Sequence, residues 1–204
     1  MLLLASFIST ILNLEISNSM TEILKSDIIS NLIQSFIHSS VISVGTIYYF
    51  YTGKLDFFPW LKIYSIGFLI ADGLYFYVYR NFNHKLIYLF HHALFIAGWI
   101  VSIKYELYLF NLLLLSEITN PFLNLKFICK KFNYPNLELT FSLITYPLFF
   151  IFRVCSFTYV VYQTHQIQVY SVWPLLLPLA GMQYYWFYLM SCKLYDFIIL
   201  MPVG

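Results

Sequence analysis

Hydrophobic side chains fill six long runs of the chain, and short polar or charged stretches separate one run from the next. The runs cover residues 28–51, 58–79, 86–103, 107–125, 139–162 and 169–192. Each is close to the roughly 20 residues that a helix needs to cross a bilayer. None alternates polar and apolar residues as a membrane β-strand does. Because backbone groups in lipid must bond within their own segment, the pattern predicts an all-α polytopic membrane protein with six transmembrane helices.

The segment before these runs, residues 1–16, is apolar but short, and it carries Asn13 and Glu15 near its end. No basic stretch precedes its apolar part, so we do not expect a cleaved signal peptide. It forms either a weakly spanning helix or an interfacial helix, and we favour the interface and expect the segment to be dispensable for insertion. The predicted organisation is an N-terminal segment at 1–27, one six-helix domain at 28–192 and a short tail at 193–204.

Composition supports a membrane protein and narrows the functional classes. Of the 204 residues, 61% are hydrophobic and only 10% are charged, whereas about a quarter of the residues in a soluble domain are charged. The net charge of +2 gives no reason to expect a nucleic-acid partner. The three cysteines lack CxxC spacing and the five histidines lack a metal-ligand pattern, so we predict no metal site and no bound cofactor.

The positions of Lys and Arg predict the orientation of the six helices. One side of the membrane would hold Lys54, Lys62 and Lys104. The other side would hold the remaining seven loop and terminal cations, which are Lys25, Arg80, Lys85, Lys126, Lys130, Lys131 and Lys193. Because positively charged loops stay in the cytoplasm, we expect both termini to be cytoplasmic.

Polar side chains inside the predicted helices fall at similar depths. At a rise of about 1.5 Å per residue, His91 lies roughly 9 Å beyond Lys85 along its helix, and Asp72 lies roughly 12 Å from Arg80. His38, Glu117 and Tyr184 reach a comparable depth on the same scale, and only Arg153 lies deeper. Since alternate helices run in opposite directions, this shared layer predicts a polar chamber that opens toward the cytoplasm.

Two adjacent histidines, His91 and His92, lie in this layer. Ionisable groups inside a membrane are costly and mark functional sites. Neighbouring helical residues point about 100° apart, so we expect one histidine to contact a substrate while a neighbour holds the other. A carboxylate beside an imidazole orients it as a general base, and Asp72 and Glu117 are the two available. The alternative is a pair of hydrogen-bonded histidines that only joins helices.

Six motifs of the chain are similar to those of the TLC-domain family, which includes translocation-associated, ceramide-synthase and related lipid proteins. In order, they are NLIQSFIHSSVISV, GFLIADGLYFY, IYLFHHALF, SEITNPFLNLKF, FFIFRV and QYYWFYL. Together they extend across residues 28–192. The resemblance implies a six-helix barrel around a lipid-accepting tunnel, and a role in lipid synthesis, transfer or sensing.

The resemblance also implies roles for individual residues. The histidine pair matches the catalytic residues with which ceramide synthases transfer an acyl group from acyl-CoA, so His91 and His92 become the expected catalytic residues, with Asp72 beside them. Acyl-CoA would be the co-substrate, and a membrane lipid or acyl chain the partner. The expected location is the endoplasmic reticulum or another endomembrane, and a homodimer is compatible with the sequence. The expected substrate-binding residues are His38, Glu117, Asn120, Arg153, Tyr184 and Trp186.

One motif departs from the ceramide synthases. Their second block reads HDxSD, whereas this chain has SEITN at residues 116–120, without the histidine and one of the aspartates. This argues against acylation of a sphingoid base and places the chain nearer to less characterised TLC-domain proteins, several of which are linked to phospholipid composition. Two functions stay open: an acyltransferase that acts on a membrane lipid, and a non-enzymatic lipid-binding protein that adjusts phospholipid composition. A channel is disfavoured, because there is no ring of like charges.

Overall fold

The computed structural model describes residues 2–24, 27–54, 58–79, 85–105 and 107–200. Every regular element in these ranges is a helix, which confirms the all-α prediction. The elements are α1 (Leu2–Leu24), α2 (Asp27–Thr52), α3 (Phe58–Tyr79), α4 (Lys85–Lys104), η1 (Tyr108–Thr119), α5 (Asn120–Lys131), α6 (Pro135–Phe149), η2 (Phe150–Cys155), α7 (Ser156–Gln166), η3 (Tyr170–Val172) and α8 (Trp173–Leu200).

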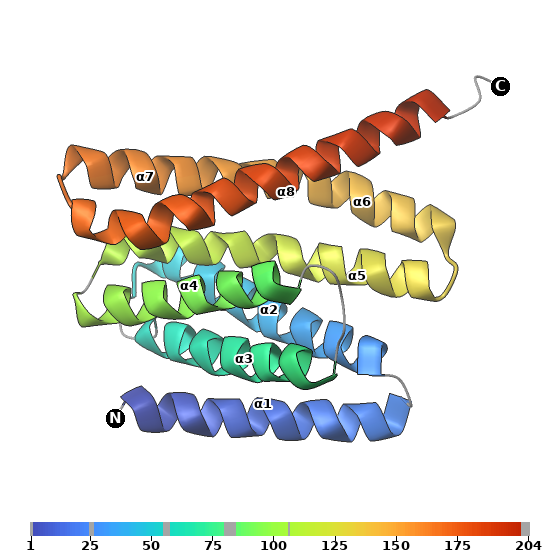
Figure 1. Cartoon of the computed structure of the whole chain (residues 1–204), viewed down its shortest axis with the longest axis horizontal. Coiled ribbons are helices and arrows are strands. Elements are labelled where there is room, and N and C mark those ends of the chain that lie inside the picture. The colour runs from blue at the N-terminus through green and yellow to red at the C-terminus, as the bar shows by residue number, and fades with distance from the viewer. Residues whose placement is uncertain (1, 25–26, 55–57, 80–84, 106, 201–204) are drawn as a thin grey trace.

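The long helices lie side by side in a layered bundle. Figure 1 shows α1 on one face, α2, α3 and α4 next to it, and α6, α7 and α8 on the opposite face, with α5 between these two groups. The chain runs without a break from η1 into α5 and from α6 through η2 into α7, so each of these sets forms one rod. The N-terminus and the C-terminus lie at opposite ends of the bundle.

Three rods within the described ranges are long and apolar enough to cross a membrane: Leu86–Lys104, Tyr108–Lys131 and Pro135–Gln166. Each of the six apolar runs of the sequence coincides with a helical rod, as residues 28–51 do with α2 and residues 58–79 do with α3. The helical bounds therefore match the expectation closely. A total of six membrane crossings stays a prediction.

One rod begins as a 3₁₀ helix, which sequence periodicity did not reveal. With three residues per turn, residues three apart in a 3₁₀ helix lie on one line. Phe110, Leu113, Ser116 and Thr119 follow this spacing along η1, and all four are buried. The hydroxyl of Ser116 donates to Leu113 O at 2.6 Å. The same geometry places Glu117 directly in line with Asn120.

The neighbouring rod contains a π-helical turn, η2, that carries Arg153. Pro147 lies inside α6 just before this turn. Proline has no N–H and cannot donate to a carbonyl of the preceding turn, and irregular turns of this kind often occur at functional sites. Arg153 is buried in this turn.

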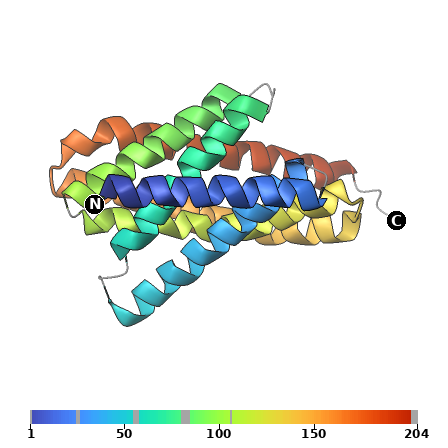
Figure 2. The same cartoon turned by 90° about the horizontal axis from the view of Figure 1, so that it is seen from below.

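α1 packs against α3 and α2 and crosses both at an angle (Figure 2). A Cβ atom added at Gly67 of α3 would overlap the side chain of Ser9 and lie 3.0 Å from Thr10 N, so glycine allows the two helices to approach. The amide of Gln34 in α2 donates to Asn13 O of α1 at 2.6 Å. α1 is thus an integral part of the bundle, and its place at the membrane interface stays a prediction.

We expect Gly67→Val to displace α1 and to destabilise the fold by about 1–3 kcal/mol, the usual consequence of overpacking. Thermal unfolding of the purified protein in detergent, followed by circular dichroism, measures this effect. The matched control is Gly98→Ala, because a Cβ atom at Gly98 meets no atom within 4 Å. Equal unfolding temperatures for the Gly67 variant and the wild type would show that the close contact with α1 is unimportant.

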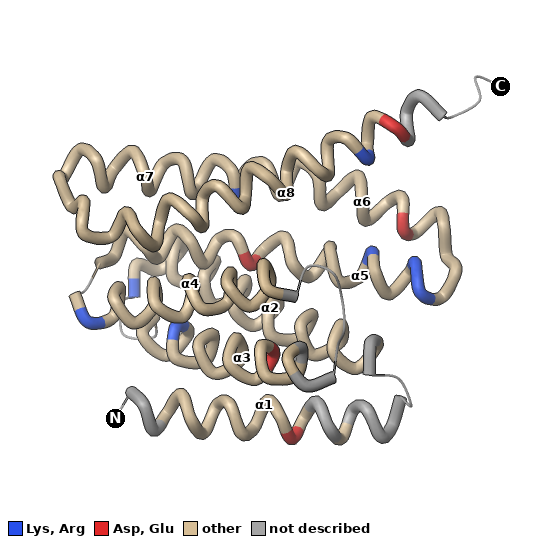
Figure 3. The backbone as a smooth tube through the Cα atoms, in the orientation of Figure 1, with Lys and Arg blue, Asp and Glu red and all other residues tan. Residues whose placement is uncertain are grey.

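Lys62 is buried rather than placed in a loop, which corrects its use as a loop charge. Only 5% of the residue is exposed, and its ammonium group donates to Ser102 Oγ at 2.6 Å. Ser102 in turn donates to Leu107 O, so the charge ties α3 to the end of α4. Figure 3 shows where the remaining described charges lie along the chain. Lys25 and Arg80, two cations of the predicted cytoplasmic side, lie outside the described residues.

Candidate functional site

His92 faces α3, where it meets Asp72. Its Nε2 atom lies 3.6 Å from Asp72 Oδ2, slightly beyond hydrogen-bond distance, and both side chains are buried. Tyr88, one turn earlier on the same face of α4, donates its hydroxyl to the same oxygen. The rings of Tyr88 and His92 lie 4.2 Å apart. Asp72 is therefore shared by a phenol and an imidazole, the kind of arrangement that orients a base.

His38 of α2 approaches the same group. Its ring stacks on Phe68 of α3 with centroids 3.8 Å apart and an angle of 8° between the planes. Phe68 lies one turn before Asp72 on α3, so His38 packs against the same face of that helix. Its Nδ1 atom is buried and has no hydrogen-bond partner in the part of the chain that the structure describes. Three helices, α2, α3 and α4, thus converge on two histidines and one aspartate.

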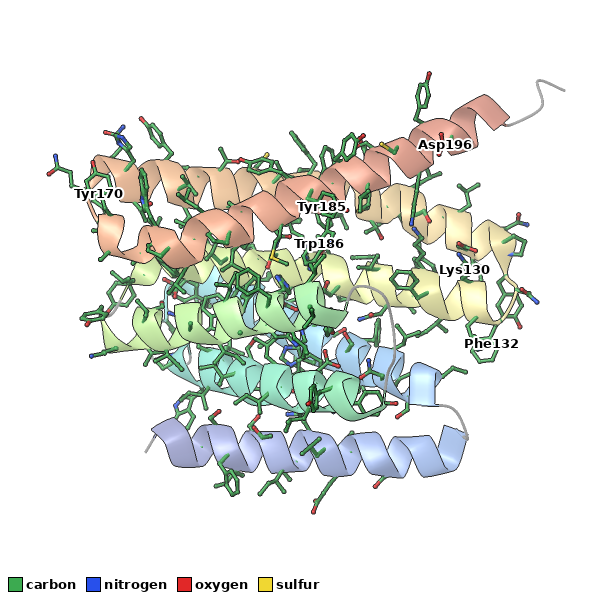
Figure 4. All side chains as sticks on the ribbon, in the orientation of Figure 1. Lys130, Phe132, Tyr170, Tyr185, Trp186 and Asp196 are labelled. Carbon is green, nitrogen blue, oxygen red and sulfur yellow. The ribbon has the colours of Figure 1, made fainter. Side chains whose placement is uncertain are left out.

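His91 points to the other side of α4, as adjacent helical positions require. Its ring packs edge to face with the rings of Trp186 and Phe95. The ring centroids lie 4.8 Å apart for Trp186 and 4.7 Å apart for Phe95. Figure 4 shows Trp186 on the side of α8 that faces α4. Among the described residues, none bonds to His91 Nδ1, which is buried. The two histidines therefore have different surroundings, a carboxylate for His92 and aromatic walls for His91.

Arg153 binds several protein groups at once. Its Nε atom donates to Thr119 Oγ1 at 2.7 Å and to Ser116 O at 3.2 Å. Its Nη1 atom donates to Gln183 Oε1 at 3.1 Å, and Nη2 donates to Asn120 Oδ1 at 2.5 Å. These bonds connect η2 with η1, α5 and α8. All three guanidinium nitrogens have protein partners, so Arg153 holds the site together.

Glu117 belongs to this second group rather than to the histidine pair. Asn120 donates to Glu117 Oε2 at 2.8 Å and accepts from Arg153, so its amide bridges the carboxylate and the guanidinium. The 3₁₀ spacing of η1 brings Glu117 and Asn120 into line. The sequence block that departs from the ceramide synthases thus forms a bonded Glu–Asn–Arg chain.

The structure brings together some of the side chains that were predicted to form one polar layer. His38, Asp72 and His92 come together, whereas His91 lies on the other side of α4 against Trp186. Glu117, Asn120 and Arg153 form the neighbouring group. Tyr184 does not join them: it is 45% exposed, and its hydroxyl lies 2.5 Å from Thr158 Oγ1. Gln183, the preceding residue, takes the inward position and is fully buried.

Sequence reasoning missed two side chains of this site, Tyr88 and Gln183. Helical spacing makes both residues candidates, although it does not show which face of the helix points inward. Tyr88 lies four residues before His92, and Gln183 lies three residues before Trp186, so each shares a helix face with an expected site residue.

Aromatic side chains pack tightly around the histidines, so a lipid-accepting chamber stays a prediction. A narrow apolar crevice with no room for a water molecule lies close by. It is lined by Phe95, Gly98, Trp99, Phe110, Leu113 and Leu179. Within the described residues, no three potential metal-binding side chains gather in one place.

Tyr88→Phe removes the phenol that bonds to Asp72 and leaves the ring against His92. We expect any His92-dependent activity to fall about tenfold, the loss of roughly one charged hydrogen bond, and the unfolding temperature to fall by a few degrees. The initial rate as a function of pH is the measurement. Unchanged rate and pH profile would show that Tyr88 does not act through Asp72.

Comparison with known proteins agrees with the motifs. The family model described as TLC domain matches residues 28–192, which include every element from α2 to most of α8. No curated protein and no solved structure matches the chain significantly. The match confirms the resemblance of the six motifs, and the family points to a lipid-related function in membranes. The chain belongs to the TLC-domain family.

Proposed function

We propose that this protein transfers an acyl group from acyl-CoA to a hydroxyl group of a glycerolipid or lysolipid within the membrane. The contact between His92 and Asp72 carries this proposal. A carboxylate beside a buried imidazole is the usual arrangement of a general base. Family membership supports a lipid as the substrate.

The proposed step begins when His92 accepts the proton of the acceptor hydroxyl. The oxygen attacks the thioester carbonyl, the carbon–sulfur bond breaks, and an ester forms. The coenzyme A thiolate leaves and takes the proton back from His92. Asp72 stabilises the transient imidazolium and is oriented by Tyr88, while Arg153 positions Asn120, Glu117 and Gln183 around the acyl group.

The proposed setting is a bundle with six membrane crossings in the endoplasmic reticulum or another endomembrane. The end of the bundle that carries Lys130 (Figure 4) would face the cytoplasm, because Lys126, Lys131 and Lys193 lie near the same end. Acyl-CoA is soluble in water, so it would reach the site from this end.

A second function is favoured by the tight aromatic packing around His38 and His91. A protein that binds a lipid and adjusts phospholipid composition needs a site that opens for an acyl chain, but it needs no base. Lipid binding by such a protein would depend on Phe68 and Trp186, which pack against the histidines, more than on the imidazoles themselves.

Lipidomics of cells that express either the wild type or the double variant His91→Asn/His92→Asn tests the proposal. We expect the wild type to change the acyl composition of glycerolipids and the variant, at equal protein level, to lose that change. A variant that changes lipid composition as the wild type does would contradict a catalytic role for the histidines.

A further inference from the structure

A group of lysines lies at the end of the bundle where α5 turns into α6. Three of them belong to α5 and one to α8, and together they form the basic patch: Lys126, Lys130, Lys131 and Lys193. Figure 3 shows the basic positions of α5 and α8 at the same end of the structure, and Figure 4 labels Lys130 there. Two residues before Lys193, the hydroxyl group of Ser191 lies 3.1 Å from that of Tyr146, which attaches this part of α8 to α6.

The positive charges of the basic patch are not neutralised by the described protein groups. The ion pair of the described residues joins His92 and Asp72, so none of their carboxylates is in ion-pair contact with a patch lysine. Glu138 of α6 attracts the ammonium group of Lys126 without such contact, whereas the patch lysines on α5 and α8 repel it. Like charges held together are unfavourable unless an anion lies among them. The patch therefore has the charge of an anion-binding surface.

Exposed aromatic side chains accompany the basic patch. Phe127, Phe132 and Tyr134 lie beside its α5 lysines, and Tyr195 is exposed on the same part of α8. The Nζ atom of Lys126 lies 5.9 Å from the centre of the Phe127 ring. In membrane proteins, aromatic side chains gather at the level of the lipid headgroups, and lysines at that level extend their charge toward the interface. Aromatic and basic side chains together place the patch at the depth of the lipid phosphates.

We propose that the basic patch binds the phosphate group of an anionic phospholipid from the leaflet at this end of the bundle. Lysine is a common phosphate ligand, and basic clusters at the ends of transmembrane helices attract anionic headgroups. A zwitterionic lipid carries a compensating positive charge in its headgroup and gains less from the same contacts. The acyl chains lie in the surrounding bilayer, where α6 exposes Leu137, Leu143 and Ile144. This lipid lies outside the bundle, so its binding does not depend on the proposed acyl transfer.

Native mass spectrometry of the purified full-length protein in detergent measures the binding. The two probes are dioleoyl phosphatidic acid and dioleoyl phosphatidylcholine, which have the same acyl chains. We expect the wild type to bind phosphatidic acid at least about tenfold more tightly, because each lysine near an anionic headgroup contributes about fivefold. The triple variant Lys126→Gln/Lys130→Gln/Lys193→Gln should lose this preference. Equal affinities of the wild type for the two lipids would overturn the proposal.

The matched control is Lys54→Gln/Lys104→Gln, which removes two exposed lysines outside the basic patch. Its preference for phosphatidic acid should equal that of the wild type. If the control loses the preference as fully as the triple variant does, net charge and not the patch causes it, and the proposal is overturned. Circular dichroism checks that each variant is folded, and the comparison of the two lipids in the wild type decides even if the triple variant does not fold.

Free coenzyme A distinguishes a lipid phosphate from a soluble one. It carries phosphate groups but no acyl chain, so at equal concentration it should not displace phosphatidic acid from the wild type. Displacement would assign the patch to a soluble phosphate and overturn the binding of a lipid. A protein that prefers phosphatidic acid but transfers no acyl group would retain the lipid site and reject the proposed enzyme. Acyl transfer by a protein without this preference would do the reverse.

Discussion

Arg153→Met is expected to destabilise the protein by about 3–5 kcal/mol, the usual effect of removing one member of a buried charged network. The substitution would leave Thr119, Asn120 and Gln183 without their donor, and the Asn120 amide that bonds to Glu117 would lose its other partner. Four helical segments would lose their common connection. Equilibrium unfolding of the purified protein in detergent, followed by circular dichroism, measures the change.

Two further variants make the Arg153 result specific. Arg153→Lys keeps the positive charge but loses the planar set of donors, so an intermediate loss of stability is expected. Lys193→Met removes an exposed cation from α8 and should have no measurable effect. Wild-type stability in Arg153→Met would contradict the assignment of Arg153 as the connecting residue. The sequence predicted that Arg153 binds a substrate, and that role stays a prediction.

His92→Asn is expected to slow acyl transfer by about 10²–10⁴-fold, the range for loss of a general base. Asn is polar and smaller than His, so the fold should be retained. Asp72→Asn should reduce the rate in the same direction, because a neutral amide cannot stabilise the imidazolium. Initial rates at saturating acyl-CoA, compared at equal amounts of folded protein, measure both effects.

His165→Asn provides the matched control, since this histidine is exposed at the end of α7, away from the site. Its rate should equal that of the wild type. If His92→Asn and His165→Asn behave alike, His92 is a packing residue. If His92→Asn unfolds while Asp72→Asn stays folded and fully active, the pair only joins α3 and α4.

The residue ranges of the helices could be predicted, because the lengths of the apolar runs and the charged stretches between them can be read from the sequence. The 3₁₀ start at residues 108–119 could not be predicted, because the spacing of Phe110, Leu113, Ser116 and Thr119 is hidden by the consecutive leucines at 112–115. The close docking of α1 depends on Gly67 meeting Ser9, a contact between segments far apart in the chain. No periodicity within either segment reveals it.

Depth along a helix could be predicted, but rotation about its axis could not. Tyr184 and Gln183 lie at nearly the same depth, yet neighbouring residues point about 100° apart, and only packing decides which one faces inward. Lys62 illustrates the same problem near a helix end. Its place in the sequence fits a loop charge, whereas its bond to Ser102 requires knowledge of where α4 lies.

Acyl transfer by purified wild-type protein in nanodiscs is the measurement on which the proposed function depends. The reaction contains acyl-CoA labelled in its acyl chain, together with lysophospholipid and diacylglycerol acceptors. Labelled glycerolipid should accumulate with the wild type and fall by about 10²–10⁴-fold with His92→Asn. If the wild type binds the label but transfers none of it to any acceptor, the protein is a lipid-binding protein and not an acyltransferase.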